Sequence, residues 1–184
     1  HADPELGIFM SMTHDLKPFL AMEPNAQCLY AVLLYDAYLF SGDKAMLRRY
    51  FDFAMKLVDR AGREEVGNSG LVRGFSLYPD NVATLGETGD DISAINNSIY
   101  FQALRGMEAL ARELDRNEIA EDLKKRGDRL AANFGRLYDA KQGFFYTSMS
   151  TTDFTLRPCV GVQAVFWITP FARELIVPDA REIA

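Results

Sequence analysis

Residues 28–40 read CLYAVLLYDAYLF, and the chain continues as SGD (41–43) and KAMLRRYFDFAMKLVDRAG (44–62) before reaching GLV (70–72). The first segment is apolar on all sides, which predicts a helix buried in an inner layer. The polar turn breaks it, and the next segment has apolar residues at helical spacing on one face only. Together the segments predict a helical hairpin with one inner and one outer helix.

The same order of segments returns about seventy residues later. It reads NSIYFQALRGMEALAREL (97–114), DRN (115–117), EIAEDLKKRGDRLAANFGRLYD (118–139) and then GFF (143–145). The two short motifs GLV and GFF begin 73 positions apart. A repeat on this scale predicts stacked helical hairpins, because neither hairpin can bury its apolar face alone. A further apolar helix, expected over 160–175 and kinked or shifted by Pro170, would begin a third hairpin.

Local signals fix how these helices begin and what they bury. Pro24 suits the first turn of the first helix, and Asp43 is expected to cap the second. Residues 1–23 are expected to form a loop with one short turn of helix, and no segment shows strong strand alternation apart from a short extended piece at 144–148. The expected buried stripes are Leu47, Tyr50, Phe51, Ala54, Leu57 and Val58, then Ile99, Tyr100, Ala103, Leu104, Met107, Leu110 and Ala111, then Ile119, Leu123, Leu130, Phe134 and Leu137.

Composition excludes several classes of function. The 184 residues carry a net charge of −6, which argues against a nucleic-acid partner, and the one basic run, 124–126, is expected to be a solvated face. No segment is apolar and long enough to span a membrane, and no secretory leader is visible, so the sequence leaves a cytoplasmic location or secretion as part of a longer precursor open. Cys28 and Cys159 are expected to be buried free thiols. No nucleotide, zinc or catalytic-triad motif is present, so neither a metal nor an organic cofactor is implied.

Three short stretches together suggest a family. The sequence YLFSGDK (38–44) resembles the "Y-x-x-T-G-D" turn of six-hairpin glycosidases, and NSIYFQAL (97–104) looks like their "N-A-L-Y-Y-x-A-L" inner helix. The stretch LYDAKQGFFY (137–146) is similar to their "L-W-D-x-x-x-G-x-Y" hairpin end. The resemblance covers about 25–175 and is to α-L-rhamnosidases and to the α-glucosidase and trehalase-like clan.

The resemblance implies an all-α fold, the α/α toroid or (α/α)6 barrel, with sugar bound in the funnel formed by loops between hairpins. It also implies inverting hydrolysis by two carboxylic residues. Six hairpins make a toroid, whereas this chain has two to three. We therefore expect 1–184 to be a single helical-hairpin domain and part of a larger barrel, which further sequence or a second copy would complete; the alternative is a shortened relative whose barrel is not completed. A catalytic carboxylate in it can then lack its partner.

The segment 75–91 is where the resemblance places the funnel, and it carries the candidate catalytic residues. On the resemblance, Asp80 is the general acid, whose pKa Tyr78 would raise by desolvation, or a group that binds sugar where the acid lies upstream, as in rhamnosidase-like members. The alternative is a plain turn at Pro79, Asp80 and Asn81. Glu87 is the candidate second carboxylate, or a ligand for a sugar hydroxyl.

Several further residues are candidates for substrate binding. Asn81 directly follows Asp80, and Asp91 lies four residues after Glu87; the favoured reading of Asp90 or Asp91 is nevertheless a cap on the helix that follows. Tyr78 and Tyr146 lie in expected loops and can stack on a sugar ring, and Arg157 can reach a hydroxyl or lie exposed. Asn96 and Asn97 are expected to hold the preceding loop by hydrogen bonds, or to cap.

Two functions therefore remain open. The first is a glycoside hydrolase, or a segment of one, acting on an oligo- or polysaccharide. The second is a non-catalytic helical-hairpin scaffold that binds carbohydrate or protein. The long period and the aromatic content of the loops favour the enzyme, because binding solenoids have periods of roughly 34 to 47 residues and short loops.

Overall fold

A computed structural model describes residues 2–3, 8–9, 24–74, 92–139, 141, 144–145, 148–149, 154–155 and 171–175. The candidate site residues of the sequence lie outside these ranges, and so do Cys159 and most of the expected helix 160–175. Of that helix, the structure describes α7 (Ala172–Leu175), which begins two residues after Pro170.

The first hairpin consists of α2 (Pro24–Ser41) and α3 (Lys44–Gly62). Pro24 is the first residue of α2, as expected. Gly42 has a φ of +62° at the turn, and Asp43 caps α3 by accepting hydrogen bonds from the amides of Ala45 (2.8 Å) and Met46 (3.0 Å). These contacts confirm the predicted turn and cap. Of the predicted stripe on α3, only Tyr50 is not buried.

The second hairpin consists of α4 (Ala94–Glu113) and α5 (Asn117–Phe134), followed by the 3-10 turn η1 (Gly135–Leu137). The predicted stripe of α4 is buried throughout, and so is that of α5 except for Ile119, which is partly buried. Asp115 takes the turn conformation of Gly42, with a φ of +59°. Residues 94–104 of α4 are all buried, so this helix is the inner member of its hairpin, as predicted.

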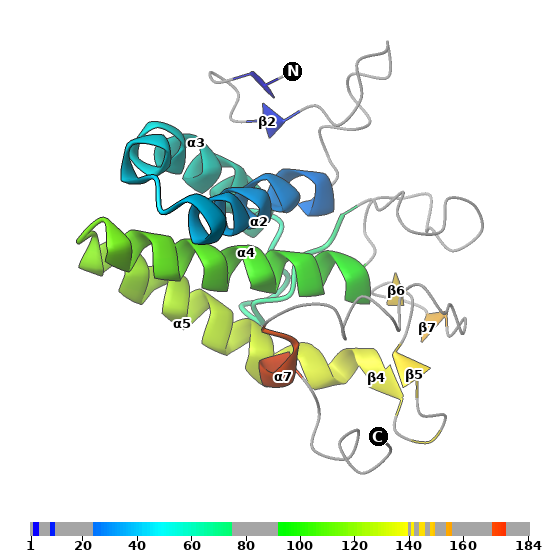
Figure 1. Ribbon diagram of the computed structural model, residues 1–184. Helices are drawn as coiled ribbons and strands as arrows, with labels where there is room; N and C mark the ends of the chain where they lie inside the picture. The colour runs from blue at the N-terminus through cyan, green and yellow to red at the C-terminus, as the bar shows by residue number, and fades with distance from the viewer. Residues whose placement is uncertain are drawn as a thin grey trace.

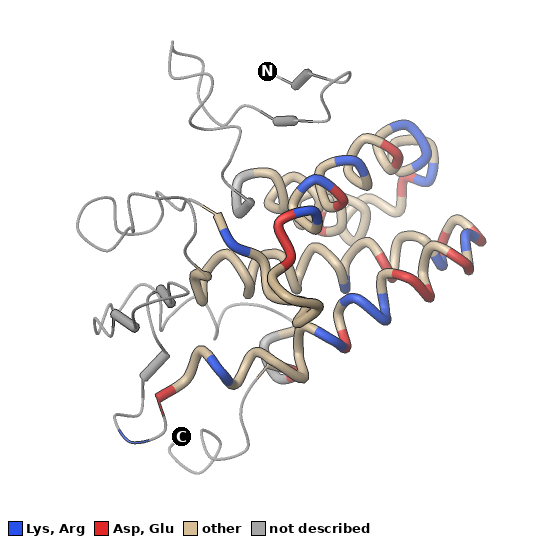
Figure 2. The backbone as a smooth tube through the Cα atoms, turned by 180° about the vertical axis from the view of Figure 1, so that it is seen from behind, with Lys and Arg blue, Asp and Glu red and all other residues tan. Residues whose placement is uncertain are grey.

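The described helices form two layers. Figure 1 shows α2 and α4 side by side and running in the same direction, with α3 and α5 returning. Figure 2 shows that charged residues gather on α3 and α5, whereas the first half of α4 carries none. The 73-residue period is also exact in the small structures that follow the outer helices: Glu65 pairs with Val72, and Tyr138 pairs with Phe145, antiparallel in both cases. The repeat predicted from sequence is therefore structural.

Seven two-residue strands are described. They are β1 (Ala2–Asp3), β2 (Ile8–Phe9), β3 (Ile92–Ser93), β4 (Tyr138–Asp139), β5 (Phe144–Phe145), β6 (Ser148–Met149) and β7 (Phe154–Thr155). β1 pairs with β2, β4 with β5, and β6 with both β3 and β7, all antiparallel. The β1–β2 pair departs from the loop and helical turn expected for 1–23. Strands of two residues are too short to show an alternation of side chains in the sequence. Their positions depend on tertiary contacts instead.

One prediction about the inner layer is wrong. The apolar helix α2 was expected to be buried on all sides, yet Leu33, Leu39 and Phe40 are 64%, 61% and 94% exposed. Its opposite face, with Cys28, Ala31 and Leu34, is buried against α3 and α4. A helix that is apolar on all sides is fully buried only if it has neighbours on all sides. The described residues pack against α2 on one side only.

Candidate functional site

The candidate catalytic and binding residues lie outside the described part of the chain. They are Asp80, Glu87, Tyr78, Asn81, Asp91, Tyr146 and Arg157. The structure does describe the frame that holds the segments carrying them. We call this frame the loop end: residues 65–74, the strands β3 to β7 and the N-terminal turns of α4.

A three-stranded sheet at the loop end connects the ends of the candidate segments. Ser93 of β3 pairs with Ser148 of β6, which in turn pairs with Thr155 of β7. Asp91 directly precedes β3, Tyr146 lies two residues before β6, and Arg157 lies two residues after β7. Segments that are more than fifty residues apart in sequence are thus anchored within one small sheet, because their flanking residues are hydrogen-bonded neighbours.

Asn97 binds the stem of the segment 75–91. Its side chain is fully buried; the carboxamide oxygen accepts from the Val72 amide at 2.7 Å, and Nδ2 donates to the Val72 carbonyl at 2.9 Å and to the Ser93 carbonyl at 2.9 Å. One amide side chain therefore satisfies both backbone groups of Val72, which is itself fully buried. The expectation that Asn97 holds the preceding loop is confirmed.

Asn96 makes a second contact with this stem. Its Nδ2 donates to the Gly74 carbonyl at 3.1 Å, while its Oδ1 is buried and has no hydrogen-bond partner among the described residues. The cap of α4 differs from the prediction: Ser93, not Asp90 or Asp91, caps this helix, because its hydroxyl accepts a hydrogen bond from the Asn96 amide at 3.2 Å. The helix begins at Ala94, directly after Ser93, which leaves Asp91 outside the cap.

The stretch from β3 into the first half of α4 contains no group for acid–base chemistry at neutral pH. Between Ile92 and Leu104 there is no carboxylate and no histidine, and the polar side chains there bond mainly to backbone groups. Tyr100 is the one ionisable group of this stretch, and burial raises its pKa to about 12, although the neighbouring Arg126 guanidinium counteracts part of that rise. Among the described residues, the carboxylates of the loop end are Glu65, which pairs with Arg129 at 3.0 Å, and Asp139.

Arg126 lies mostly buried between the helices, contrary to the expectation from sequence. It was expected on a solvated face with Lys124 and Lys125, but its side chain is only 17% exposed. It donates to Asp59 at 2.7 Å and to the Tyr100 hydroxyl at 2.9 Å. Burial alone would lower the pKa of Arg126, but Tyr100 and Asp59 outweigh it and raise the pKa. Arg126 lies three residues after Leu123 and therefore on the buried face of the helix. That spacing is the feature of the sequence from which its burial could have been predicted.

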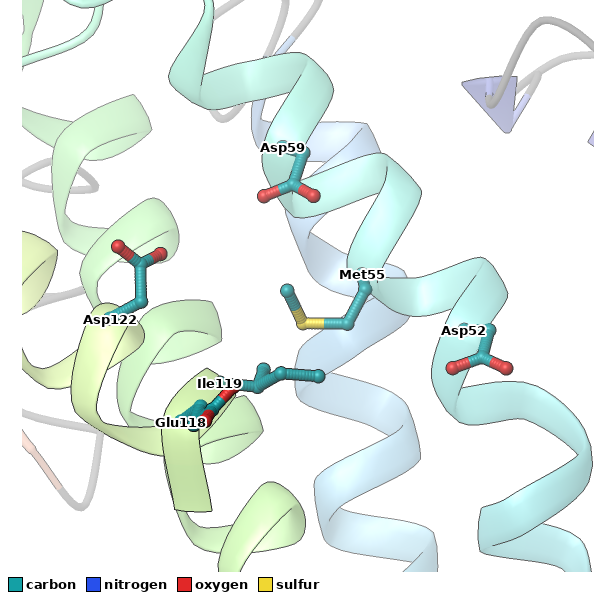
Figure 3. A pocket seen from close by; sticks show the side chains of 6 residues that line it. All are labelled: Asp52, Met55, Asp59, Glu118, Ile119 and Asp122. Atoms are coloured by element: carbon teal, nitrogen blue, oxygen red, sulfur yellow. The ribbon is translucent and has the colours of Figure 1, made fainter. Parts of the chain in front are cut away.

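A hollow of about 410 Å³ lies between the outer helices α3 and α5, away from the loop end. Figure 3 shows Met55 and Ile119 between the two helices, with Asp52 and Asp59 on one helix and Glu118 and Asp122 on the other. Arg116 pairs with Asp52, and Arg126 pairs with Asp59 and Asp122. Most of these carboxylates are thus ion-paired parts of the hairpin interface.

Within the described ranges, no three His, Cys, Asp or Glu side chains are grouped closely enough to hold a metal ion. Among the same residues, no helix is both long and apolar enough to cross a bilayer. Cys28 is a buried free thiol, as expected, and burial raises its pKa.

The comparisons with known proteins agree with this architecture. No protein-family model matches the sequence, and no curated protein matches it. Among solved structures, the fold is similar to a GH78 family rhamnosidase of Bacillus sp. GL1, with a TM-score of 0.72 and 17% identity over 87% of this chain and 17% of that one. A rhamnosidase from Klebsiella oxytoca with rhamnose bound matches with a TM-score of 0.69 and 21% identity over 97% of this chain and 33% of that one.

The chain has an α/α-toroid fold like that of the matching part of these two structures. This confirms the all-α class and the six-hairpin resemblance that the sequence suggested. At these identities the likeness concerns the fold alone. The toroid segment spans 17% and 33% of the two rhamnosidases, so their activities do not transfer to it without a test.

Proposed function

We propose that this toroid segment belongs to an inverting glycoside hydrolase that acts on an oligo- or polysaccharide. The single observation that carries the proposal is the β3–β6–β7 sheet. It anchors the ends of the acidic, aromatic segment 75–91 and of the segments that contain Tyr146 and Arg157 at one end of the inner helices. A sugar site needs carboxylates and flat aromatic surfaces together, and these segments contain both.

The proposed chemistry rests on two carboxylates. Inverting hydrolysis needs an acid at the leaving oxygen and a base about 6.5–9.5 Å away, with room for water between them. Asp80 is the candidate acid, and Glu87 is the candidate base unless the base lies elsewhere in the barrel. Tyr78 and Tyr146 are proposed to stack on the sugar, while Asn81, Asp91 and Arg157 are proposed to bind its hydroxyl groups.

The names of the two structural neighbours guide the choice of substrate. Both are called rhamnosidases, so rhamnosides are the first substrates to test. That relationship also favours the alternative in which Asp80 binds sugar and the acid lies on another segment. The two roles of Asp80 predict different kinetics and can therefore be separated.

The test is Asp80→Asn in the full-length protein, with substrates that differ only in their leaving group. If Asp80 is the acid, hydrolysis of a poor leaving group falls by about 10²–10⁴-fold, while hydrolysis of an activated aryl glycoside changes little because that group needs no proton. If Asp80 binds sugar, both substrates lose equally, by roughly 10–150-fold in kcat/KM.

A matched control is Asp115→Asn. Asp115 lies in the exposed turn between α4 and α5, at the far end from the loop end, and asparagine tolerates its positive φ. This variant should retain full activity. An active parent enzyme whose Asp80→Asn variant hydrolyses both substrates at the parent rate would assign Asp80 to a turn.

A non-catalytic scaffold is the second candidate. This chain spans only 17% and 33% of the two structural neighbours, so it need not contain a complete pair of carboxylates. That fact favours the scaffold. Full-length protein that binds rhamnosides or oligosaccharides in calorimetry and hydrolyses none of them would establish this function instead.

A further inference from the structure

We infer that Asn96 binds carbohydrate at the loop end, where its Oδ1 atom accepts a hydrogen bond from one hydroxyl group of the sugar. The inference rests on the proposed function and extends it, because it adds a residue of the described frame to the site. Asn96 is the third residue of α4 and is fully buried. Its contact with Gly74 places it beside the stem that leads into the segment 75–91.

The carboxamide of Asn96 is held in one orientation, but only one end of it is used. Nδ2 donates to the Gly74 carbonyl at 3.1 Å. The reverse orientation would set Oδ1 against that carbonyl oxygen, and two acceptors cannot bond to each other. Oδ1 is buried and has no hydrogen-bond partner among the described residues. A hydrogen-bond acceptor is therefore fixed beside the stem with its own bond unmade.

The neighbouring polar side chains differ from Asn96 in this respect. Asn97 uses both ends of its carboxamide in three hydrogen bonds, and Ser98 donates to the Ile95 carbonyl at 2.9 Å. Most buried polar groups in proteins are hydrogen-bonded, and a buried acceptor without a partner costs stability. Contacts within the chain thus account for Asn97 and Ser98, whereas Oδ1 of Asn96 points to a donor that arrives with a ligand.

The surroundings of Oδ1 select the kind of donor. An amide oxygen only accepts, so the ligand group must carry a proton. From Ile92 to Leu104 no side chain is negatively charged, so nothing on this stretch compensates a buried ammonium or guanidinium group. Because Asn96 is 0% exposed, the donor must also be small. A neutral hydroxyl group meets all three conditions, and carbohydrates project such groups singly from a ring.

The test combines Asn96→Leu with the removal of single hydroxyl groups from the sugar. Calorimetry on the full-length protein measures the binding of rhamnose and of each derivative in which one hydroxyl is replaced by hydrogen. For the derivative that lacks the partner of Oδ1, we expect the parent protein to bind roughly 5–150-fold more weakly than it binds rhamnose. In Asn96→Leu this one ratio should fall to within about 2-fold of unity, while the ratios of the other derivatives stay as in the parent.

The matched control is Ser98→Ala, which removes a buried polar group of the same helix whose partner is the Ile95 carbonyl. This variant should keep the parent's ratio for every derivative. If Asn96→Leu also keeps every ratio and weakens all the sugars by one common factor, Asn96 acts only through the fold and the inference is wrong.

A crystal structure of the parent protein with rhamnose gives an answer that does not depend on the folding of a variant. A ligand oxygen should lie within about 3.2 Å of Oδ1. A water molecule or a backbone amide in that place would overturn the inference. Parent protein that neither binds nor hydrolyses carbohydrate would refute the proposed function and this inference with it, whereas binding without a contact to Oδ1 would refute this inference alone.

Discussion

Replacing Asn97 with alanine should destabilise the protein severely, because the Asn97 side chain makes three buried hydrogen bonds. The substitution leaves the Val72 amide, the Val72 carbonyl and the Ser93 carbonyl without these partners. An unsatisfied buried group costs about 1–3 kcal/mol, so we expect a loss of about 3–5 kcal/mol. The whole free energy of unfolding of a domain is only about 5–15 kcal/mol.

Urea unfolding followed by circular dichroism measures this loss. The matched control is Asn133→Ala, because Asn133 is partly buried and makes one hydrogen bond, at 3.0 Å, to a carbonyl of its own helix. That variant should lose no more than about 1 kcal/mol. A loss in Asn97→Ala as small as that of the control would refute the argument that the buried clamp holds the stem of 75–91.

Asn97→Asp tests the direction of the hydrogen bonds. The aspartate can still accept from the Val72 amide, but when ionised it cannot donate to the two carbonyls. Burial raises the pKa of such a carboxyl in the folded state above its unfolded value of about 3.9. The variant should therefore regain stability relative to wild type as the pH falls towards about 4, where protonation restores one donor. A stability difference independent of pH would contradict this assignment.

Two further predictions concern packing and ionisation. Gly70→Ala should cost about 3 kcal/mol or more, because its Cβ would lie 2.5 Å from the Leu130 nitrogen, whereas Gly67→Ala, with a similar positive φ and open space, should cost only about 1–2 kcal/mol in urea unfolding. Tyr100 has its pKa raised from 10.0 to about 12, so the unfolded chain ionises first and stability should fall between these pH values by up to about 3 kcal/mol. In alkaline titrations of stability, Tyr100→Phe should lack that part of the decrease; an unchanged pH profile would contradict the burial of the hydroxyl.

The parts of the fold that sequence predicted are those with a local cause. The cap at Asp43, the first-turn Pro24 and the stripe on α4 each follow from hydrogen-bonding geometry or helical spacing within a few residues. The 73-residue period was also visible in sequence, and the pairing of Val72 and of Phe145 confirms it. These features need no knowledge of distant neighbours.

The parts that sequence missed depend on contacts across the chain. Arg126 looked like a surface cation because it follows two lysines, but Asp59 and Tyr100 pair with it from other helices. Ser93 caps α4 because the β3–β6 pairing fixes where the strand ends, and that pairing joins residues 55 apart. The roles of Asp80 and Glu87 remain predictions, since they lie outside the described residues.

The exposure of α2 follows from the same distinction. Composition predicted an inner helix, but which of its faces are covered depends on contacts that lie outside the segment itself. α3 and α4 cover the face with Cys28 and Ala31, whereas Leu33 and Phe40 are exposed among the described residues.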